Sequence, residues 1–585
     1  MNLKQYYKQL KIAEKFAAEN NYLAVRNTLW NWFEFIQNDN SLIDEKGLKL
    51  LLNSAINLDK NNIDELTRSI KIYEFCAKLD KCNTLLLKNL GKLYSLNGQF
   101  DNIISTFSEI AEQENSQICL LCKKIITYFD NENYKNLPNF NTLLKQSFIN
   151  LFDDNYDEFI RDFIINLHFG NKYNEEQLSK LTFEYGNILL ERAEFQYNKW
   201  ENINFKNINS RLKVGLLPGN FNDGPMGVFL EGVFKNIDKS KLEIFVFETD
   251  CYKQDYLTKQ IIPNLEHFIS CKDKTDKELA EFIYNNGIQI LVDLHGFAPG
   301  HRLQVFAYKP APIQITWMGY WATTGLKTMD YIIGDNIVTP ENEYHHYIEK
   351  VYKLPYCFFH LSTPEDVYTN PLLEVKETPF IKNGYITFGN FSYPAKQTDN
   401  VIKVWAEILK NVPNSKLMLK YFSLDDKQNQ NYIIYRFQKY GINKERLIFE
   451  GGSKRYELLN TYNKIDYTLD TFPYIGGTST LQSIFMGVPV ITKKGNSYLS
   501  HIGESSLYNA GLSQFIAEDE NDYINKASEF CKPENILKYN KEIRLNIRKF
   551  LMDKPLFNTQ QFTIDVENMF FDLWNEYLNK NKNKI

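Results

Sequence analysis

A short run of glycine and hydroxyl residues, Gly-Gly-Thr-Ser-Thr at 476–480, has the composition of a phosphate-binding turn. Gly476 and Gly477 would let the backbone approach a ligand closely, because neither carries a Cβ atom. A helix that starts after such a turn presents unpaired N–H groups and the positive end of its dipole, and both favour an anion. Further hydroxyl donors would come from Thr478, Ser479 and Thr480.

The sequence on either side of this turn predicts the elements that would position it. We expect a buried strand that ends in Asp470, a helix over about 481–486 and a second strand over 488–492. The same pattern also fits an ordinary capped helix after a strand. The turn by itself therefore leaves phosphate binding and simple helix capping as equal alternatives.

Polar residues follow several other predicted strands, where a parallel sheet would bring them to one edge. Lys396 lies shortly after the strand predicted at 385–391, and its ammonium group could offset negative charge that develops on a leaving diphosphate. Other candidates at this edge are Asn220, Asn222, Asp223, His295, His301, Arg302 and Asn390. Together with the turn, they form a constellation of a lysine, histidines and an acid around a phosphate site.

Several motifs that would indicate other chemistry are missing. No HxH, HExxH or Asp-x-Asp pair supplies convincing metal ligands, and we therefore expect no metal. The chain also lacks GxSxG, a GxxxxGK[ST] loop and a GxGxxG after the first predicted strand. Hydrolase, ATPase and dehydrogenase interpretations lose support, and transfer from a nucleotide-linked donor remains.

Length and composition set the broad class. With 585 residues the chain is expected to form two to four domains, and a hydrophobic content of 43% is ample for large cores. The net charge of −5 and the absence of a basic block disfavour nucleic acid as a partner. We find no signal peptide and no run long enough to span a membrane, and the eight scattered cysteines favour a reducing, cytoplasmic location.

The first part of the chain, residues 1–205, carries helical periodicity and almost no strand signal. Leu90-Gly91, Tyr94 and Gly98 have the spacing of a tetratricopeptide repeat, in which the small residue permits close helix crossing. Weaker copies occur at 12–33 and 70–80, and an unrelated helical bundle is the alternative. We expect an all-α platform for binding or for homo-oligomer formation.

After residue 210 the pattern changes to strands that alternate with helices, which predicts an α/β fold with parallel sheets. We expect two Rossmann-like domains, at 211–375 and 385–550, that face a ligand cleft, and a closing helix and tail at 551–585. The expected strands lie within 211–221, 242–250, 288–297, 385–391, 416–422, 446–451, 465–472 and 488–492.

Four long blocks resemble the protein O-GlcNAc transferases and their SPINDLY-like relatives. The block DLHGFAPGHRLQVFAYKPAPIQITWMGYWATTGLKTMDYIIGD at 293–335 is similar to the family signature, and 388–420 is similar to its lysine loop and following helix. DTFPYIGGTSTLQSIFMGVPVIT resembles the donor-phosphate turn, and the segment at 555–578 resembles the closing helix. The blocks occur in the family's order, and the resemblance covers roughly 211–578.

The resemblance implies a GT-B architecture and a metal-independent, inverting transfer of a sugar to polypeptide side chains. The co-substrate would be a nucleotide sugar, most often UDP-GlcNAc, and Ser or Thr would be the acceptor. Lys396 matches the lysine at the donor diphosphate, Thr478 and Ser479 match the phosphate-binding hydroxyl pair, and His267 matches a histidine near sugar and acceptor. Residues expected to line the first domain's side of the cleft are Pro312, Gln314, Gly319 and Tyr320.

The chain departs from the family pattern at several site positions. Asp223 stands in the loop where the family has its usual base histidine, so the base would be Asp223, a water or the donor phosphate. Gly477 replaces a histidine of the animal enzymes, Gln482 replaces an acid on the following helix, and Leu458 replaces a histidine in the uridine region that begins at Ser453. We count His295 among the catalytic candidates and Asp470 among the donor-binding ones.

Three alternatives to O-GlcNAc transfer follow from these departures. One is an asparagine-directed glucosyltransferase of the adhesin-modifying type, and another is a SPINDLY-like fucosyltransferase that uses a GDP donor. The third is an inactive scaffold that binds and does not catalyse.

Overall fold

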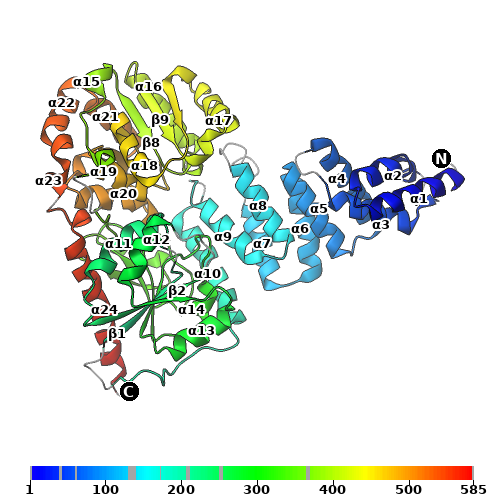
Figure 1. Cartoon of the computed structure of the whole chain (residues 1–585), viewed down its shortest axis with the longest axis horizontal. Helices are drawn as coiled ribbons and strands as arrows, with labels where there is room; N and C mark the ends of the chain where they lie inside the picture. Colours follow the sequence, from blue (N-terminus) through cyan, green and yellow to red (C-terminus); the bar gives the residue numbers. More distant parts are fainter. Residues whose placement is uncertain are drawn as a thin grey trace. The chain divides into compact units, whose positions relative to one another are not determined.

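The computed structural model describes the chain except for residues 1–2, 39–41, 59–61, 129–139, 171–172, 206–210, 220, 250–254, 364–368, 552 and 583–585. The candidate residue Asn220 therefore lies outside the described residues. The chain divides into two compact units, Met1–Phe163 and Ile164–Ile585. The described part of the first unit is helical, and the second unit contains both β-sheets (Figure 1).

Consecutive helices of the first unit pack against one another from α1 to α7, and α8 packs against α5. Gly91 of α5 lies against the ring of Phe152 in α8, and a Cβ atom at Gly91 would overlap that ring. A small residue is therefore required where these two helices cross. The helices are α1 (Leu3–Ala18), α2 (Tyr22–Ile36), α3 (Glu45–Ile56), α4 (Ile63–Leu79), α5 (Thr84–Asn97), α6 (Phe100–Glu114), α7 (Gln117–Tyr128) and α8 (Phe140–Phe152), and α9 (Tyr156–Leu167) spans the boundary between the units.

The second unit begins with the end of α9 and with α10 (Glu175–Arg192), which packs against α14 of the first sheet domain. The sequence placed residues 164–205 in the helical domain, whereas their contacts group them with the sheets. The carbonyl of Gly325 approaches Gly186 of α10 so closely that a Cβ atom would overlap it. The helix α10 is thus part of the second unit, which contains both sheets.

The first sheet and the helices around it form a domain that we call the N-lobe. The sheet has seven parallel strands in the order β3-β2-β1-β4-β5-β6-β7. Its strands are β1 (Leu212–Leu217), β2 (Leu242–Glu248), β3 (His267–Ser270), β4 (Ile290–Asp293), β5 (Ile313–Thr316), β6 (Tyr331–Gly334) and β7 (Lys350–Lys353). The helices among them are α11 (Pro225–Asn236), α12 (Tyr256–Ile261), α13 (Asp276–Asn285), α14 (Leu303–Ala307) and the short η4 (Glu341–His346).

The second sheet, the C-lobe, has six parallel strands in the order β10-β9-β8-β11-β12-β13. These are β8 (Thr387–Asn390), β9 (Lys416–Lys420), β10 (Leu447–Glu450), β11 (Tyr467–Leu469), β12 (Val490–Lys493) and β13 (Ile516–Ala517). Its helices are α15 (Phe380–Asn383), α16 (Asp399–Asn411), α17 (Lys427–Gln438), α18 (Arg455–Thr461), α19 (Thr478–Phe485), α20 (Tyr498–Asn509), α21 (Glu520–Phe530), α22 (Pro533–Glu542) and α23 (Ile547–Leu551).

The central strands are buried on both faces, which explains their nearly continuous apolar sequences. In β4 and β5 every residue is buried, and β1 and β2 each keep one half-buried position. Apolar runs of this kind are typical of parallel sheets covered by helices on both sides. The two parallel sheets and the helical N-terminal part confirm the predicted fold class.

The chain crosses back to the N-lobe at its end. The long helix α24 (Thr559–Asn581) packs against α11 and β5, and it runs beside the N-lobe in Figure 1. Glu567 of α24 accepts a hydrogen bond from the backbone N–H of Asp238 at 2.6 Å. The closing helix thus ties the end of the C-lobe sequence to the other lobe.

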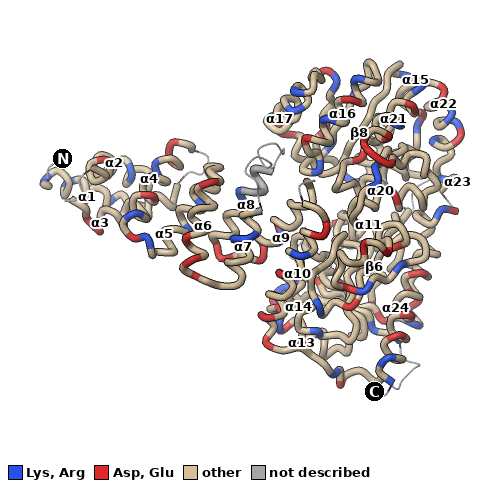
Figure 2. Tube along the Cα trace, turned by 180° about the vertical axis from the view of Figure 1, so that it is seen from behind, with Lys and Arg blue, Asp and Glu red and all other residues tan. Residues whose placement is uncertain are grey.

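Charged residues of both signs are interspersed along the chain, as Figure 2 shows. Among the helices that the structure describes, none is long and apolar enough to cross a membrane.

Candidate active site

A cleft of about 500 Å³ lies between the two lobes, and five of the predicted donor-binding residues, Ser453, Gly477, Thr478, Ser479 and Gln482, line it together with Lys396 and Asp223. Its N-lobe wall consists of the loop before α11, the first residues of that helix and the loop after β5. The C-lobe wall consists of loops that follow the carboxyl ends of β8, β9, β10 and β11. The residues that line it are Asp223, Gly224, Pro225, Met226, Val228, Met318, Gly319, Trp321, Phe391, Ser392, Tyr393, Lys396, Tyr421, Ser453, Arg455, Leu458, Tyr474, Gly477, Thr478, Ser479 and Gln482.

The glycine turn enters the cleft as the start of α19. This helix begins at Thr478, three residues before the predicted start, and Gly477 occupies the N-cap position without a capping side chain. The first N–H groups of a helix have no partner within the helix, and here the residues that carry them, Thr478 and Ser479, line the cleft. The turn therefore presents backbone donors, hydroxyl groups and the positive end of a helix dipole to the cavity.

Asp470 holds this turn in place from behind. Its carboxylate accepts hydrogen bonds from the N–H of Gly476 at 2.8 Å, from the N–H of Thr471 at 3.0 Å and from the hydroxyl of Thr492 at 2.8 Å. Burial raises the pKa of Asp470 to about 6, although these hydrogen bonds and Lys396 oppose the rise. Asp470 does not line the cleft, so it acts by fixing the backbone of the turn.

Thr480 also supports the turn from inside. Its hydroxyl donates to the carbonyl of Gly476 at 3.0 Å, and the residue is 1% exposed. Gly477 lies against the indole of Trp321, and a Cβ atom there would overlap the ring. The N-lobe thus approaches the turn closely at this point, which only glycine allows. Among the three hydroxyl residues predicted to bind phosphate, Thr478 and Ser479 face the cleft and Thr480 does not.

Lys396 ends the short helix η6 (Pro394–Lys396) that follows β8, and it reaches the glycine turn. Its ammonium group donates to the carbonyl of Ile475 at 2.8 Å and lies 4.1 Å from the ring centroid of Tyr474. Burial lowers the pKa of Lys396 to about 8, and the nearby Asp470 partly opposes this. The ammonium group of Lys396 is thus held beside the start of α19.

The N-lobe wall carries Asp223, and an arginine of the C-lobe faces it. Arg455, the first residue of α18, places its Nε 3.8 Å from Asp223 Oδ1 and its Nη1 3.7 Å from Glu231 Oε2. Burial is the largest effect on Asp223 and raises the pKa of its carboxyl, while Arg455 opposes the rise. An acid and a cation from different lobes therefore share one end of the cleft.

Several predicted first-lobe residues support the cleft without lining it. The side chain of Gln314 is fully buried and donates to the carbonyls of Phe306 and Thr328, both at 2.9 Å. Pro312 is buried, and the hydroxyl of Tyr320 lies 3.2 Å from His168 Nε2. Gly319 alone of the four lines the cavity, between Met318 and Trp321.

The two histidines nominated as catalytic residues also lie outside the cleft lining. His267 begins β3, and therefore sits at the amino end of a sheet whose carboxyl ends face the cavity. Its ring stacks on Phe245, with centroids 4.1 Å apart, and its Nε2 lies 2.9 Å from a carboxylate oxygen of Glu243. His295 follows β4, where burial lowers its pKa to about 4 and keeps the ring neutral.

Several cleft residues were not singled out as site residues from the sequence. Arg455, Trp321, Tyr393 and Tyr421 line the cavity together with the predicted Lys396 and Phe391. A local signal existed for Arg455, because it follows the strand β10 and begins a helix at the edge where ligands bind. Trp321 directly follows the predicted Gly319-Tyr320 pair.

We also looked for residues that could hold a metal ion. Within the described parts of the chain, no group of three or more His, Cys, Asp or Glu side chains gathers closely enough to do so.

Several known proteins are similar to this chain in sequence. SPINDLY of Arabidopsis thaliana, named a probable UDP-N-acetylglucosamine–peptide N-acetylglucosaminyltransferase, is 29% identical over 393 residues, which cover 65% of this chain and 41% of the relative. The SEC protein of the same plant, with the same activity in its name, is 28% identical over 376 residues, which cover 62% and 37%. The chain thus spans about two fifths of the length of these relatives.

A solved structure extends the likeness to nearly the whole fold. A mutant O-GlcNAc transferase of Thermobaculum terrenum superimposes with a TM-score of 0.67 at 23% identity, and covers 99% of this chain and 98% of its own. The model of glycosyl transferase family 41 matches residues 172–362 and 360–566, which include both walls of the cleft. The chain therefore belongs to glycosyl transferase family 41.

Proposed function

We propose that the chain transfers GlcNAc from UDP-GlcNAc to serine or threonine hydroxyl groups of polypeptides, with inversion at the anomeric carbon and without a metal ion. The observation that carries this proposal is the convergence of the α19 N-terminus and Lys396 at the floor of the inter-lobe cleft. A diphosphate is the group that these donors suit. The names of the relatives, which specify UDP-N-acetylglucosamine and peptide, support the choice of sugar, nucleotide and acceptor.

The reaction can be written from these residues. The acceptor oxygen attacks the anomeric carbon from the side opposite the diphosphate, a C–O bond forms, and the bond to the diphosphate oxygen breaks with its electron pair. Negative charge then grows on the leaving group through an oxocarbenium-like transition state. Donors already aimed at that position stabilise it without reorganisation, and the loss of one such donor typically raises the barrier by about 3–4 kcal/mol.

Asp223 is our proposal for the group that accepts the acceptor's proton. It lines the cleft on the wall opposite the phosphate turn, and burial raises the pKa of its carboxyl, which brings it nearer to that of an effective general base. Arg455 is proposed to contact the donor's nucleotide portion, because it lines the same end of the cleft as Ser453 and Leu458. His267 and His295 carry no role in this scheme, since neither lines the cavity.

The helical first unit is proposed to present acceptor polypeptides and to mediate self-association, because repeats of this type form extended binding surfaces. We propose a cytoplasmic location from the scattered cysteines, which form no disulfide wherever the structure describes them.

Two measurements test the proposal. In a thermal-shift series with UDP, GDP and their sugars, UDP and UDP-GlcNAc should raise the melting temperature, since a ligand that binds only the native state stabilises it. Incubation with a lysate of the source cells and UDP-GlcNAc should then add one N-acetylhexosamine to serine or threonine, as read by peptide mass spectrometry. A shift with GDP alone would identify a GDP-sugar enzyme, modified asparagine would identify the glucosyltransferase alternative, and no shift with any nucleotide would favour a scaffold.

A further inference from the structure

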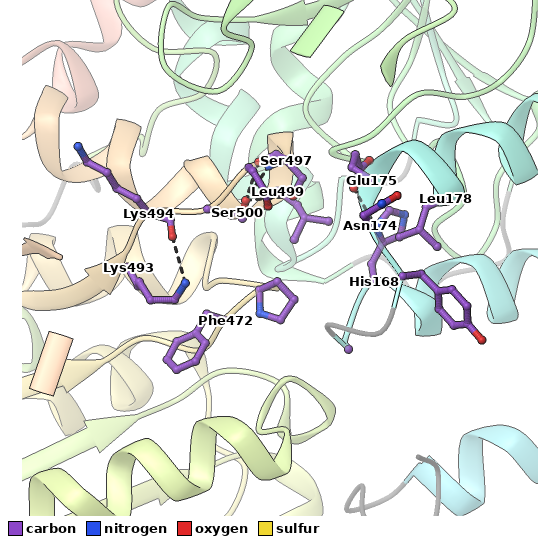
Figure 3. A pocket seen from close by; sticks show the side chains of 15 residues that line it. His168, Asn174, Glu175, Leu178, Phe472, Lys493, Lys494, Ser497, Leu499 and Ser500 are labelled. Atoms are coloured by element: carbon purple, nitrogen blue, oxygen red, sulfur yellow. Dashed lines mark hydrogen bonds and ion pairs between the residues drawn. The ribbon is translucent and has the colours of Figure 1, made fainter. Parts of the chain in front are cut away.

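A second cavity, of about 300 Å³, lies outside the donor cleft, between the corner that joins α9 to α10 and the turn that joins β12 to α20. We call it the α20 groove. In Figure 3, His168, Asn174 and Glu175 stand on the helical side, and Lys493 and Phe472 stand on the opposite side. The loop of residues 472–477 separates it from the cleft, because Phe472 and Pro473 line the groove while Tyr474 and Gly477 line the cleft.

The C-lobe wall of the groove repeats the design of the phosphate turn, one strand further along the sheet. The strand β12 runs into Gly495, where a Cβ atom would overlap the side chain of Ser500, and α20 follows. Ser497 and Ser500 cap this helix reciprocally, with the N–H of Ser497 donating to the hydroxyl of Ser500 at 2.9 Å. Among described residues, the backbone N–H groups at the first two helix positions, Tyr498 and Leu499, have no partner.

Lys493 adds a positive charge that is not neutralised within the described structure. Its ammonium group donates to the carbonyl of Lys494 at 3.2 Å and lies 5.2 Å from the ring centroid of Phe472, and no described carboxylate pairs with it. The neighbouring Lys494 differs, because it forms ion pairs with Glu518 at 2.9 Å and with Glu504 at 3.7 Å. The groove therefore holds a cation without a described carboxylate partner, and of the two residues with unpaired N–H groups Leu499 lines it.

Glu175 faces the groove from the helical side, and it is the one carboxyl group in the described lining. Its side chain is only 9% exposed, and its Oε2 lies 3.8 Å from His168 Nδ1, beyond hydrogen-bond distance. Burial raises the pKa of Glu175 to about 8 and lowers the pKa of His168 to about 4. Both groups are thus neutral near pH 7, so Glu175 offers an O–H donor there.

We propose that the α20 groove is a second anion site, which binds a tetrahedral oxyanion of the phosphate class through Lys493, the N-terminal N–H groups of α20 and the carboxyl O–H of Glu175. A cationic ligand fits less well, because Lys493 and the positive end of a helix dipole face the groove. Free phosphate and a phosphomonoester on a polypeptide present the same group to these donors.

The first experiment measures phosphate binding by calorimetry on the full chain, with saturating UDP present to occupy the donor cleft. Inorganic phosphate and N-acetyl-phosphoserine amide are the two probes, and the tighter one identifies the natural source. Lys493→Met keeps the stem over Phe472 but removes the charge, and we expect it to weaken binding by at least about tenfold. Lys538→Met, an exposed position on α22, is the matched control and should bind as the parent does.

The second experiment uses sulfate, whose own charge is constant across the range, and follows its affinity from about pH 7 to about pH 8.5. Ionisation of Glu175 above its pKa should weaken binding by at least about threefold, and Glu175→Gln should remove this dependence. Burial holds the pKa values of Tyr320 and Tyr347, which act on Glu175, well above 10, so neither titrates in this range. His501 lies 3.0 Å from Glu343, and in spite of burial its carboxylate partners raise its pKa to about 9, so the affinities are compared between about pH 7 and about pH 8.5.

Equal affinity of the parent and Lys493→Met for phosphate would overturn the proposal, and so would the absence of phosphate binding in the presence of UDP. A pH dependence that survives in Glu175→Gln would remove Glu175 from the site. The melting temperature of each variant is measured as a control. If it equals that of the parent, a loss of binding is not caused by unfolding.

Discussion

The ammonium group of Lys396 donates a hydrogen bond to the carbonyl oxygen of Ile475 at 2.8 Å. This bond joins the loop after β8 to the turn that starts α19, although the two residues are far apart in the sequence. The lysine is therefore positioned by the same backbone that presents the N–H donors. Charge, helix dipole and glycine turn form one preorganised unit.

The lowered pKa of Lys396 predicts how kcat/KM for the donor depends on pH. Because burial lowers the pKa of Lys396 to about 8, the charged form is present below that pH and is lost as pH rises through it. We expect kcat/KM for the donor to fall above about pH 8. The fall in kcat should occur at a higher pH than the fall in kcat/KM, since a bound diphosphate favours the protonated form of Lys396. A kcat/KM that stays constant to about pH 10 would contradict this role of Lys396.

The carboxylate of Asp470 predicts a stability effect. Asp470→Ala would leave the N–H groups of Gly476 and Thr471 and the hydroxyl of Thr492 without their acceptor. Because buried donors without a partner are costly, we expect a loss of about 2–4 kcal/mol in the free energy of unfolding. Chemical denaturation of the ligand-free protein measures this, and an unchanged midpoint would show that the turn does not depend on Asp470.

The contact between Gly477 and Trp321 predicts a steric effect on donor binding. A side chain at Gly477 would overlap the indole, so Gly477→Val should push the N-lobe away from the turn. We expect KM for the donor to rise by about tenfold or more. The double variant with Trp321→Ala should recover part of the affinity, because the obstructing ring is gone. Additive losses in the double variant would rule out this steric coupling.

The facing pair Asp223 and Arg455 predicts two separable phenotypes. Asp223→Asn cannot accept a proton, so we expect a loss of about 10²–10⁴-fold in kcat with little change in UDP affinity. Arg455→Ala should instead weaken UDP binding by about tenfold or more, because a cation that lines the cleft is removed. Calorimetry with UDP and steady-state kinetics distinguish the two. Normal turnover by Asp223→Asn would assign proton transfer to another group.

The donor turn could be predicted from the sequence because its parts are adjacent. Gly476 and Gly477 precede the hydroxyl residues directly, and the strand and helix on either side have clear patterns. The helix begins earlier than the pattern indicated, since Thr478 and Ser479 form its first positions and are not part of a free loop. Both sheets were also predictable in type, because their buried strands are apolar runs.

Other features depend on how distant segments meet. Arg455 reaches Asp223 across two lobes, and no local pattern encodes that distance. The resemblance placed His267 near the sugar. In the structure it is the first residue of β3, which pairs in parallel with β2, so it lies at the end of the sheet away from the cleft. The strands β3, β5, β6, β7 and β13 were not among the expected strands, and length alone does not explain this, because β4, β8, β10 and β12 also have only four residues.

The most direct test of the account is the transfer rate of Lys396→Met with radiolabelled UDP-GlcNAc and acceptor proteins of the source cells. The exposed Lys403→Met on α16 serves as the matched control. We expect Lys396→Met to lose at least about a hundredfold in turnover while its melting temperature and the activity of the control stay at the parent's values. Transfer by Lys396→Met at the parent's rate would contradict the proposal that this lysine stabilises the leaving diphosphate.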